Sequence, residues 1–431
     1  MYSNLSLYAI LRRILSELNE QIVDHGDRVA YLYLKMAEFR EKEDNRYFEN
    51  MMLTCYAHDI GAYKTEKFLD LLRFDVTHTL EHCVYGYLFM KYFSPIGDDA
   101  EVLLYHHTYY SDRDKYESPH LDEGILIHFL DRVDIFSLKY DSNDDVIHQC
   151  MNGAGRNFNP KDVEEFIAAE EKYSILQHLR DGSYRSDVQN YFNQPHRLAR
   201  LLGPIINMLA YEVDFKSEQT VIHSITTTLL ATILASKLGL SADEIRDLEY
   251  AARVHDLGKI DVDSEILEKP GKLTAEEYQL MKRHVEYTEV ILRDLFPAPV
   301  TIIASHHHER LDGSGYPRGL RGDQLSLSDR IMQVADVASA LLQRRSYKEA
   351  LDKETVVSIL QQEAANGKLD AAIISLLVEE YDGIIPEVWE RSKDTIRCYE
   401  GLQAEYQHYL AELNQVENDE FEEFDLFPNA Q

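Results

Sequence analysis

The chain is poor in the residues that mark disulfide frameworks, turn-rich folds and membrane spans. Its four cysteines, Cys55, Cys83, Cys150 and Cys398, are scattered without a CxxC pair, which favours reduced cytosolic thiols over a disulfide framework. Only 19 glycines and 11 prolines occur in 431 residues, and they mark short turns. No apolar run approaches the roughly 20 residues that span a bilayer, and the amino terminus lacks a signal-peptide pattern. We therefore expect a cytoplasmic protein with no membrane partner.

Positive charge is also scarce. The sequence has 44 Lys and Arg against 76 Asp and Glu, for a formal net charge of −32. A chain this acidic should repel long nucleic acids and anionic membranes. If the substrate is anionic, a local site of metal ions and a few Lys and Arg residues must attract it. The 18 histidines, many of them paired or beside Asp, are the most informative part of the composition.

Apolar residues recur at helical spacing along most of the chain, as in TTTLLATILASKLGL and DAAIISLLVEEY, and few stretches alternate like strands. The sequence therefore predicts an all-α protein. Residues 386–415 have the pattern of a further helix, with apolar positions that we expect to pack on a neighbouring element or on a second copy in a homodimer. The stretch ENDEFEEFDLFPNAQ that follows is interpreted as a disordered, solvated acidic tail, with a partner-binding motif as the alternative.

An internal repeat organises the sequence. The first half contains EQIVDHGDRV, AHDIGAY, TLEHCVYGYLFM, LLYHHTYY and HFLDRVDIF, and the second half contains EQTVIHSITT, VHDLGKI, MKRHVEYTEVIL, SHHHERLDGSGYP and QVADVASAL. Both halves follow the order His, His-Asp, His, His-His, Asp at similar separations. We therefore predict two tandem helical domains of one type, over 1–150 and 205–385, joined by a helical linker region over 151–204 and followed by a carboxyl-terminal helix and tail over 386–431.

The repeated histidines and aspartates are a set of candidate metal ligands. Those of the second half are His223, His255, Asp256, His284, His307, His308 and Asp336. The carboxylate of a His-Asp pair can bridge two ions while the histidine binds one of them. Two ions about 3.5–4 Å apart activate water and clamp phosphate oxygens during in-line displacement. Ligation by His and Asp without thiolate suits iron or manganese better than structural zinc.

These motifs resemble those of the HD-GYP family, a branch of the HD metal-dependent phosphohydrolases. HDLGKI matches the HD-x-G-K element, HHERLDGSGYP matches HHE-xx-DG-x-GYP, and RIMQVADVASALLQRRSYKEAL is similar to a third conserved stretch. The resemblance covers about 170 residues. It implies a helical fold with a two- or three-metal site that hydrolyses cyclic dinucleotides, chiefly cyclic di-GMP, to linear pGpG and further to GMP.

The resemblance also implies a role for each matching residue. Asp256 bridges the ions, and the other six residues of the set complete the ligands. Among the three adjacent histidines the motif selects His307 and His308, so we expect His306 to lie outside the metal shell or in solvent. Lys259, with Asp256 the expected catalytic pair, would neutralise substrate phosphate. The remaining expected substrate-binding residues are Tyr316, Arg345 and Lys348.

Three departures from the family pattern qualify this expectation. A Glu that precedes the first histidine in three-metal members is Gln219 here, so two ions are favoured over three. Ser339 and Ser346 stand where the family usually has Asp and Pro, and we expect both changes to be tolerated.

The first half keeps a complete ligand set but lacks the expected substrate-holding residues. Ala62 replaces the lysine, and no GYP follows the His106-His107 pair. We expect a metal-bound domain without cyclic-dinucleotide hydrolysis, in a sensory or structural role, with another phosphohydrolase activity or a silent relic as alternatives. The candidate ligands are His25, His58, Asp59, His82, His106, His107 and Asp131. The histidines at 120, 128, 148, 178 and 196 fall outside the repeated order and receive no role.

Three functions remain open on the sequence alone. The first is hydrolysis of cyclic di-GMP. The alternative substrate is 3′3′-cyclic GMP-AMP, because the sequence does not identify the residues that recognise the bases. The second is a receptor that binds the nucleotide without turnover. The third is oxygen-dependent di-iron chemistry, which product formation without oxygen would exclude.

Overall fold

The computed structural model describes residues 6–16, 20–61, 79–214, 218–267, 269, 271–293, 295–342 and 351–417. Regular structure in these ranges is helical, and extended pairing is limited to isolated bridges such as Ala154 with Phe158. The predicted all-α class is therefore confirmed. The chain divides into two compact units, each described by itself: unit 1 comprises residues 1–18 and 192–399, and unit 2 comprises residues 19–191 and 400–431.

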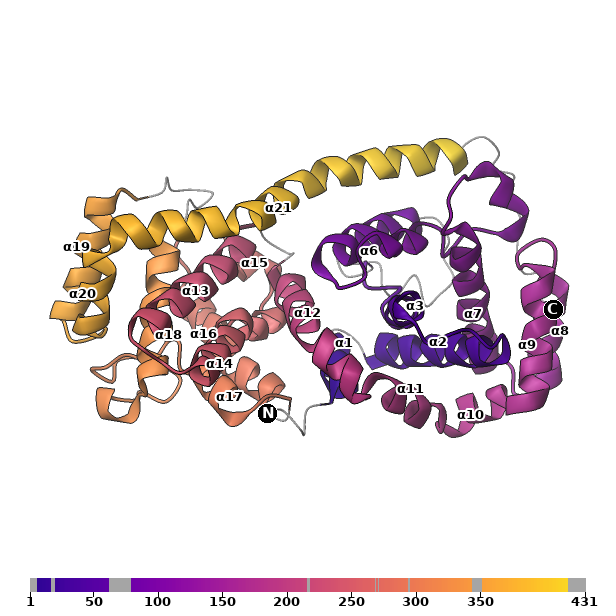
Figure 1. The fold of residues 1–431 in the computed structure, drawn as a ribbon, viewed down its shortest axis with the longest axis horizontal. Coiled ribbons are helices and arrows are strands. Elements are labelled where there is room, and N and C mark those ends of the chain that lie inside the picture. Colours follow the sequence, from indigo (N-terminus) through magenta and orange to yellow (C-terminus); the bar gives the residue numbers. More distant parts are fainter. Residues whose placement is uncertain are drawn as a thin grey trace. The chain divides into compact units, whose positions relative to one another are not determined.

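The helices of each unit follow the chain in order (Figure 1). Unit 1 contains α1 (Leu7–Ser16), α12 (Pro195–Asp214), α13 (Glu218–Lys237), α14 (Ala242–Val254), the 3₁₀ helix η4 (Leu257–Asp261), α15 (Ser264–Leu267), α16 (Ala275–Leu292), α17 (Ala298–Ser305), η5 (Gly322–Gln324), α18 (Leu327–Leu342), α19 (Lys353–Ala365), α20 (Ala371–Glu379) and the first part of α21 (Tyr381–Glu417). Unit 2 contains α2 (Glu20–Phe39), α3 (Arg46–Tyr56), α6 (Thr79–Phe93), η2 (Gly97–Leu104), η3 (Tyr110–Lys115), α7 (Leu121–Lys139), α8 (Asn143–Gly153), α9 (Pro160–Tyr173), α10 (Ile175–Asp181), α11 (Tyr184–Phe192) and the remainder of α21.

The packing of unit 1 is centred on α13, which contacts α12, α14 and α18, while α16 contacts η4 and α17. Local sequence fixes where two of these helices begin. Ser241 with Glu244 and Thr274 with Glu277 form capping boxes at the starts of α14 and α16, and each box satisfies amide groups that the first helical turn leaves unpaired. Helix α14 then ends at Val254, immediately before the His-Asp pair.

Unit 2 is built in the same way around α2, which contacts α3, α7 and α9, while α6 contacts η2. Of the predicted helical linker region 151–204, residues 151–191 contain the end of α8 and helices α9 to α11 and are grouped with unit 2, while the rest is grouped with unit 1. The domain limits drawn from the sequence stay predictions, because compact units and evolutionary domains need not share boundaries.

The carboxyl-terminal helix is longer than the 386–415 expected, since α21 covers Tyr381–Glu417. Within unit 2 its apolar face is buried against α6, where the Tyr406 ring stacks on that of Tyr85 at 4.0 Å between centroids, and Leu402 and Leu413 are also buried. The helix therefore packs on a neighbouring element of its own chain, and a homodimer stays a prediction. The acidic tail beyond residue 417 lies outside the described residues.

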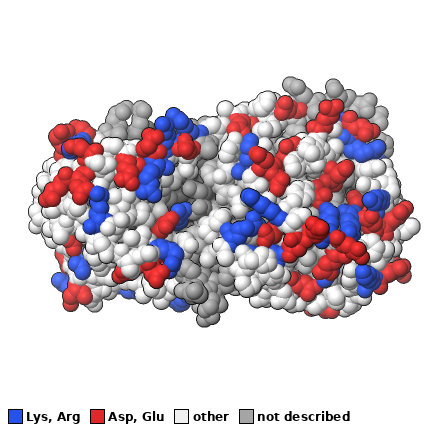
Figure 2. All heavy atoms as spheres, viewed as in Figure 1, with Lys and Arg blue, Asp and Glu red and all other residues white. Residues whose placement is uncertain are grey.

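On the face drawn in Figure 2, described Lys and Arg side chains are interspersed with Asp and Glu. None of the described helices is both long and apolar enough to cross a membrane.

Candidate metal centres

Five separate elements of unit 1 bring the predicted ligands of the second half together. His223 lies on α13, the His-Asp pair lies between α14 and η4, His284 lies on α16, the His307-His308 pair follows α17, and Asp336 lies on α18. Potential ligand atoms of His223, His255 and Asp336 lie within 4.8 Å of one another, as do those of His284, His307 and His308. We call this cluster, with Asp256, centre 1.

Hydrogen bonds to the backbone orient the imidazoles of centre 1. His255, His284 and His307 each donate Nδ1–H to the carbonyl of the residue three positions earlier, at 2.6–2.8 Å. His223 Nδ1 lies 3.2 Å from the hydroxyl of Ser339. Because a carbonyl can only accept, three of the five rings of centre 1 carry their proton on Nδ1 and turn Nε2 toward the cluster, the usual arrangement of metal-binding histidines.

The Asp256 carboxylate lies between the two groups of ligands. Its Oδ2 is 3.3 Å from His255 Nε2 and 3.9 Å from His223 Nε2. Its Oδ1 is 3.3 Å from His284 Nε2 and 3.8 Å from His307 Nε2. One oxygen therefore faces each group, which is the disposition that a carboxylate bridging two ions requires.

The donors of centre 1 fit divalent cations. His284 Nε2 and His307 Nε2 lie only 3.3 Å apart, although both rings already carry their proton on Nδ1, so two lone pairs face each other with no hydrogen between them. His255 Nε2 is buried and makes no well-formed hydrogen bond with the described residues, although Asp256 Oδ2 lies 3.3 Å from it. Carboxylates and neutral imidazoles around a buried point are suitable ligands for Fe²⁺, Mn²⁺ or Zn²⁺.

The electrostatics of centre 1 also favour a cation. Burial alone would lower the pKa of His255, but the carboxylates of Asp256 and Asp336 outweigh it and raise this pKa to about 9. Although Asp256 is buried, its histidine neighbours and Lys259 hold its pKa well below the usual range. Burial lowers the pKa of His308 to about 3, so this ring is neutral and free to act as a ligand at pH 7.

A pH-dependent uptake of metal follows from the raised pKa of His255. Below pH 9 a proton on His255 competes with the ion, so we expect the affinity of chelator-treated protein for Mn²⁺ to rise from pH 7 to 9 and then to level off.

The folding stability of the metal-free protein changes in the opposite sense. A raised histidine pKa contributes stability that is complete below about pH 6.5 and is lost as the pH rises through about 9. Metal titrations and melts across this range measure both trends, and pH-independent uptake would contradict the assignment.

Two of the four predicted substrate-binding residues lie beside centre 1. Lys259 Nζ is 2.6 Å from Asp256 Oδ2. The ring of Tyr316 lies against His308, with 4.8 Å between centroids, and Lys282 Nζ lies 4.9 Å from the centre of the same tyrosine ring. Lys282 was missed by sequence reasoning, although its position two residues before His284 placed it on the correct helix. The predicted residues Arg345 and Lys348 lie outside the described residues, as does Ser346, and the side chain of Gln219 is not described either.

The third adjacent histidine lies outside the metal cluster, and it is buried rather than in solvent. His306 Nδ1 lies 3.2 Å from Asp329 Oδ1, and its Nε2 lies 2.9 Å from an Arg318 guanidinium nitrogen. Glu309, also buried, accepts hydrogen bonds from the backbone amides of Arg318 and Leu320 at 2.7 and 2.8 Å. Both side chains thus hold the loop that carries Tyr316.

Unit 2 contains a second cluster of the same plan, which we call centre 2. Its predicted ligands come from α2, the α3 end, α6, the segment after η2, and α7; they are His25, His58, Asp59, His82, His106, His107 and Asp131. Asp59 Oδ2 lies 3.8 Å from His25 and 3.6 Å from His58, while its Oδ1 lies 3.8 Å from His82 and 3.9 Å from His106. The bridging position is therefore repeated. The predicted lysine replacement, Ala62, lies outside the described residues.

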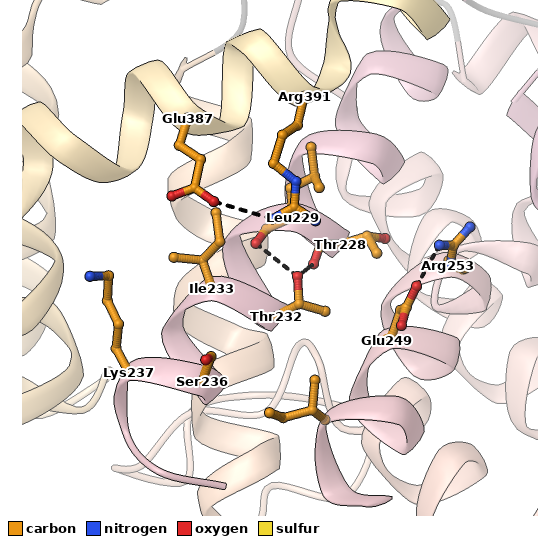
Figure 3. Close-up of a pocket in the computed structure, with 11 residues that line it drawn as sticks. Thr228, Leu229, Thr232, Ile233, Ser236, Lys237, Glu249, Arg253, Glu387 and Arg391 are labelled. Carbon is orange, nitrogen blue, oxygen red and sulfur yellow. Dashed lines mark hydrogen bonds and ion pairs between the residues drawn. The ribbon is translucent and has the colours of Figure 1, made fainter. Parts of the chain in front are cut away.

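A groove elsewhere on unit 1 offers a different surface. It is lined by α13, α14 and α21 (Figure 3). Each cation that lines it pairs with a carboxylate: Lys237 with Glu380, Arg253 with Glu249 and Arg391 with Glu387. None of the centre 1 ligands is among its lining residues, so the groove is a poor candidate for binding an anionic substrate.

The sequence of this chain is similar to those of several known proteins. The family described as HD domain matches residues 204–373. The chain is 30% identical over 396 residues to 3′3′-cGAMP-specific phosphodiesterase 1 of Vibrio cholerae serotype O1, which covers 85% of this chain and 89% of that protein. It is 34% identical over 262 residues to 3′3′-cGAMP-specific phosphodiesterase 3 of the same organism, and this match covers 58% of this chain and 56% of that protein. It is 40% identical over 167 residues to the cyclic di-GMP phosphodiesterase response regulator RpfG of Xanthomonas campestris pv. campestris, covering 38% and 44%.

The first of these matches extends over both units, and the sequence motifs contain the predicted ligands that unit 1 brings together. Metal-dependent hydrolysis is the chemistry of the HD domain, and both units contain the His and Asp clusters that it needs. The chain belongs to the HD-GYP family of HD-domain phosphodiesterases.

Proposed function

We propose that centre 1 hydrolyses a cyclic dinucleotide, with 3′3′-cyclic GMP-AMP as the preferred substrate and cyclic di-GMP as the second candidate. The observation that carries the hydrolase is the Asp256 carboxylate between two groups of histidines. The order of substrates reverses the expectation from sequence. It rests on the relative that is matched over 89% of its length and is named for cyclic GMP-AMP.

Seven residues would hold two divalent ions in centre 1. His223, His255 and Asp336 form one group, His284, His307 and His308 form the other, and Asp256 lies between them. Their nitrogen and oxygen donors suit Fe²⁺ or Mn²⁺. Such ions, when bound, lower the pKa of water and neutralise phosphate charge.

The chain's own residues would orient and neutralise the substrate phosphate. Lys259 lies against Asp256 and can place its ammonium group on a phosphate oxygen, and Tyr316 offers a ring and a hydroxyl beside His308. Burial raises the pKa of the Tyr316 hydroxyl, which therefore stays a donor. In the reaction water adds to phosphorus, the bond from phosphorus to the 3′ oxygen breaks, and that oxygen takes a proton. The product is a linear dinucleotide with a 5′ phosphate.

Replacing Lys259 by Met should lower kcat/KM by about 10²-fold, the loss typical of removing one charged donor from a transition state. Lys259 is outside the ligand set, so metal content should stay that of the wild type. Lys259→Arg keeps the charge and should restore part of the rate. Steady-state kinetics with metal analysis measure these effects, and an unchanged kcat/KM in Lys259→Met would remove this residue from the proposed site.

The proposed function is tested by anaerobic turnover of both cyclic dinucleotides by the full chain loaded with Mn²⁺ or Fe²⁺, followed by separation of the products. We expect linear dinucleotide from both, with kcat/KM for 3′3′-cyclic GMP-AMP higher by about tenfold or more, which corresponds to about 1.4 kcal/mol. The reverse order would restore cyclic di-GMP as the main substrate. Binding without product would support the receptor, and product that requires oxygen would support di-iron chemistry.

A further inference from the structure

Centre 2 has two potential ligands that have no counterpart in centre 1. Aligning the repeat on His82 and His284 places Cys83 opposite Val285. Aligning it on Asp131 and Asp336 places His128 opposite Gln333. The two centres therefore differ by a thiol and an imidazole at otherwise matching positions, and both extra groups are buried.

The thiol lies among the ligands of centre 2. Ligand atoms of Cys83, His82, His106 and His107 all lie within 4.8 Å of one another, and Cys83 Sγ is 3.8 Å from His82 Nε2. His82 Nε2 is also 3.2 Å from His106 Nε2 and 3.0 Å from His107 Nε2. His106 donates its Nδ1–H to the carbonyl of Leu103, so its Nε2 presents a lone pair. Four donors that converge in this way, three of them buried and His107 half-buried, match the number and spacing of a four-coordinate site.

His128 provides an independent sign of a ligand at the same centre. It is only 4% exposed, and neither of its ring nitrogens has a hydrogen-bond partner among the described residues. Its ligand atom lies within 4.8 Å of those of His107 and Asp131. A buried imidazole without any partner is costly, and a cation at this point would satisfy it.

A thiolate changes which ion such a site prefers. Nitrogen and oxygen donors leave centre 1 suited to iron or manganese, whereas Cys with several His selects Zn²⁺ and related ions. Cys83 also adds one protein donor to the group that centre 1 forms from His284, His307, His308 and Asp256. A donor added in this way would occupy a position that a catalytic site leaves open for water or substrate.

We propose that centre 2 is a closed site for a thiophilic divalent cation of the zinc class, with Cys83 as a ligand beside His82, His106 and His107, and with His128 as an additional buried donor. The site retains its ion and stabilises unit 2 rather than hydrolysing the substrate of centre 1. This proposal does not depend on which cyclic dinucleotide centre 1 uses.

Cobalt substitution of the full chain tests the thiolate directly. Co²⁺ bound to sulfur gives a charge-transfer band in the near ultraviolet, and the ligand set of centre 1 contains no cysteine, so the band reports on centre 2. We expect the band in the wild type and its loss in Cys83→Val, which installs the residue of centre 1 and preserves an apolar side chain. Cys150→Ser, at a buried cysteine of α8 outside the cluster, is the matched control and should keep the band.

Retention of zinc against a chelator is the second measurement. Loss of Cys83 should weaken zinc binding by more than the roughly 10–100-fold that loss of an outer hydrogen-bond partner costs, and His128→Gln should weaken it in the same direction. If Cys83→Val fails to fold, the wild-type spectrum still decides the question: cobalt bound in unit 2 without a sulfur band overturns the proposal. A band that persists in folded Cys83→Val overturns it as well.

Discussion

Asp256→Asn should lower hydrolysis of the cyclic dinucleotide by about 10³-fold or more and release metal from centre 1. The carboxylate offers one oxygen to each group of histidines, whereas the neutral amide of Asn has a single oxygen and an NH2 group that does not bind cations, so it cannot face both groups as a ligand. Two-metal sites contribute several kcal/mol of charge stabilisation, and about 1.4 kcal/mol corresponds to tenfold in rate. Initial rates at saturating Mn²⁺, together with metal content by elemental analysis, measure both effects.

The repeat provides a matched control for this substitution. Asp59 occupies the same position in centre 2, with its oxygens 3.6–3.9 Å from four histidines. Asp59→Asn should therefore disturb the ion of unit 2 while hydrolysis stays within about tenfold of the wild type. Loss of hydrolysis in Asp59→Asn with full activity in Asp256→Asn would mean that the two centres have been assigned the wrong way round.

The sequence was sufficient to predict the all-α class and the residues that meet in the two clusters. It was sufficient because the His and Asp residues recur in one order in both halves. The HD-x-G-K and GYP elements also fix the positions of these residues relative to one another in the second half. His306 shows where this reasoning ended. Its neighbour His307 is a predicted ligand, but the burial of His306 against Asp329 and Arg318 depends on α18 and a loop approaching from elsewhere in the chain.

The extra donors of centre 2 escaped notice for a related reason. His128 precedes Asp131 by one helical turn, and Cys83 follows His82 directly, so both signals were present in the sequence. The repeat, however, emphasised what the halves share, and these two residues are among their differences. Only the three-dimensional arrangement shows that His128 is buried without a partner beside His107 and Asp131.

Gly258→Ala should strongly impair centre 1, although Gly258 binds neither metal nor substrate. A Cβ at this position would lie 2.0 Å from the carbonyl oxygen of His284 and 2.6 Å from the amide nitrogen of Thr288. Both atoms belong to the backbone of α16, so the helix must move away from η4. That movement separates His284 from Asp256. Overpacking of this kind costs about 1–3 kcal/mol of folding stability, and a displacement of about 1 Å can cost 10²-fold in rate.

Denaturant unfolding and steady-state kinetics of Gly258→Ala measure these losses. Substitutions of two other glycines distinguish the effect of close packing from a general effect of the added methyl group. Gly61→Ala meets the same obstruction in unit 2, 2.0 Å from the carbonyl oxygen of His82, and should destabilise that unit while hydrolysis continues. Among the described residues, no atom outside the adjacent backbone of the same helix lies within 4 Å of a Cβ added at Gly203. Gly203→Ala should therefore be neutral or slightly stabilising, because alanine favours a helix. Wild-type activity in Gly258→Ala would show that α16 can shift to accept the methyl group without displacing His284. The contact between η4 and α16 would then not determine the distance between the two ligand groups.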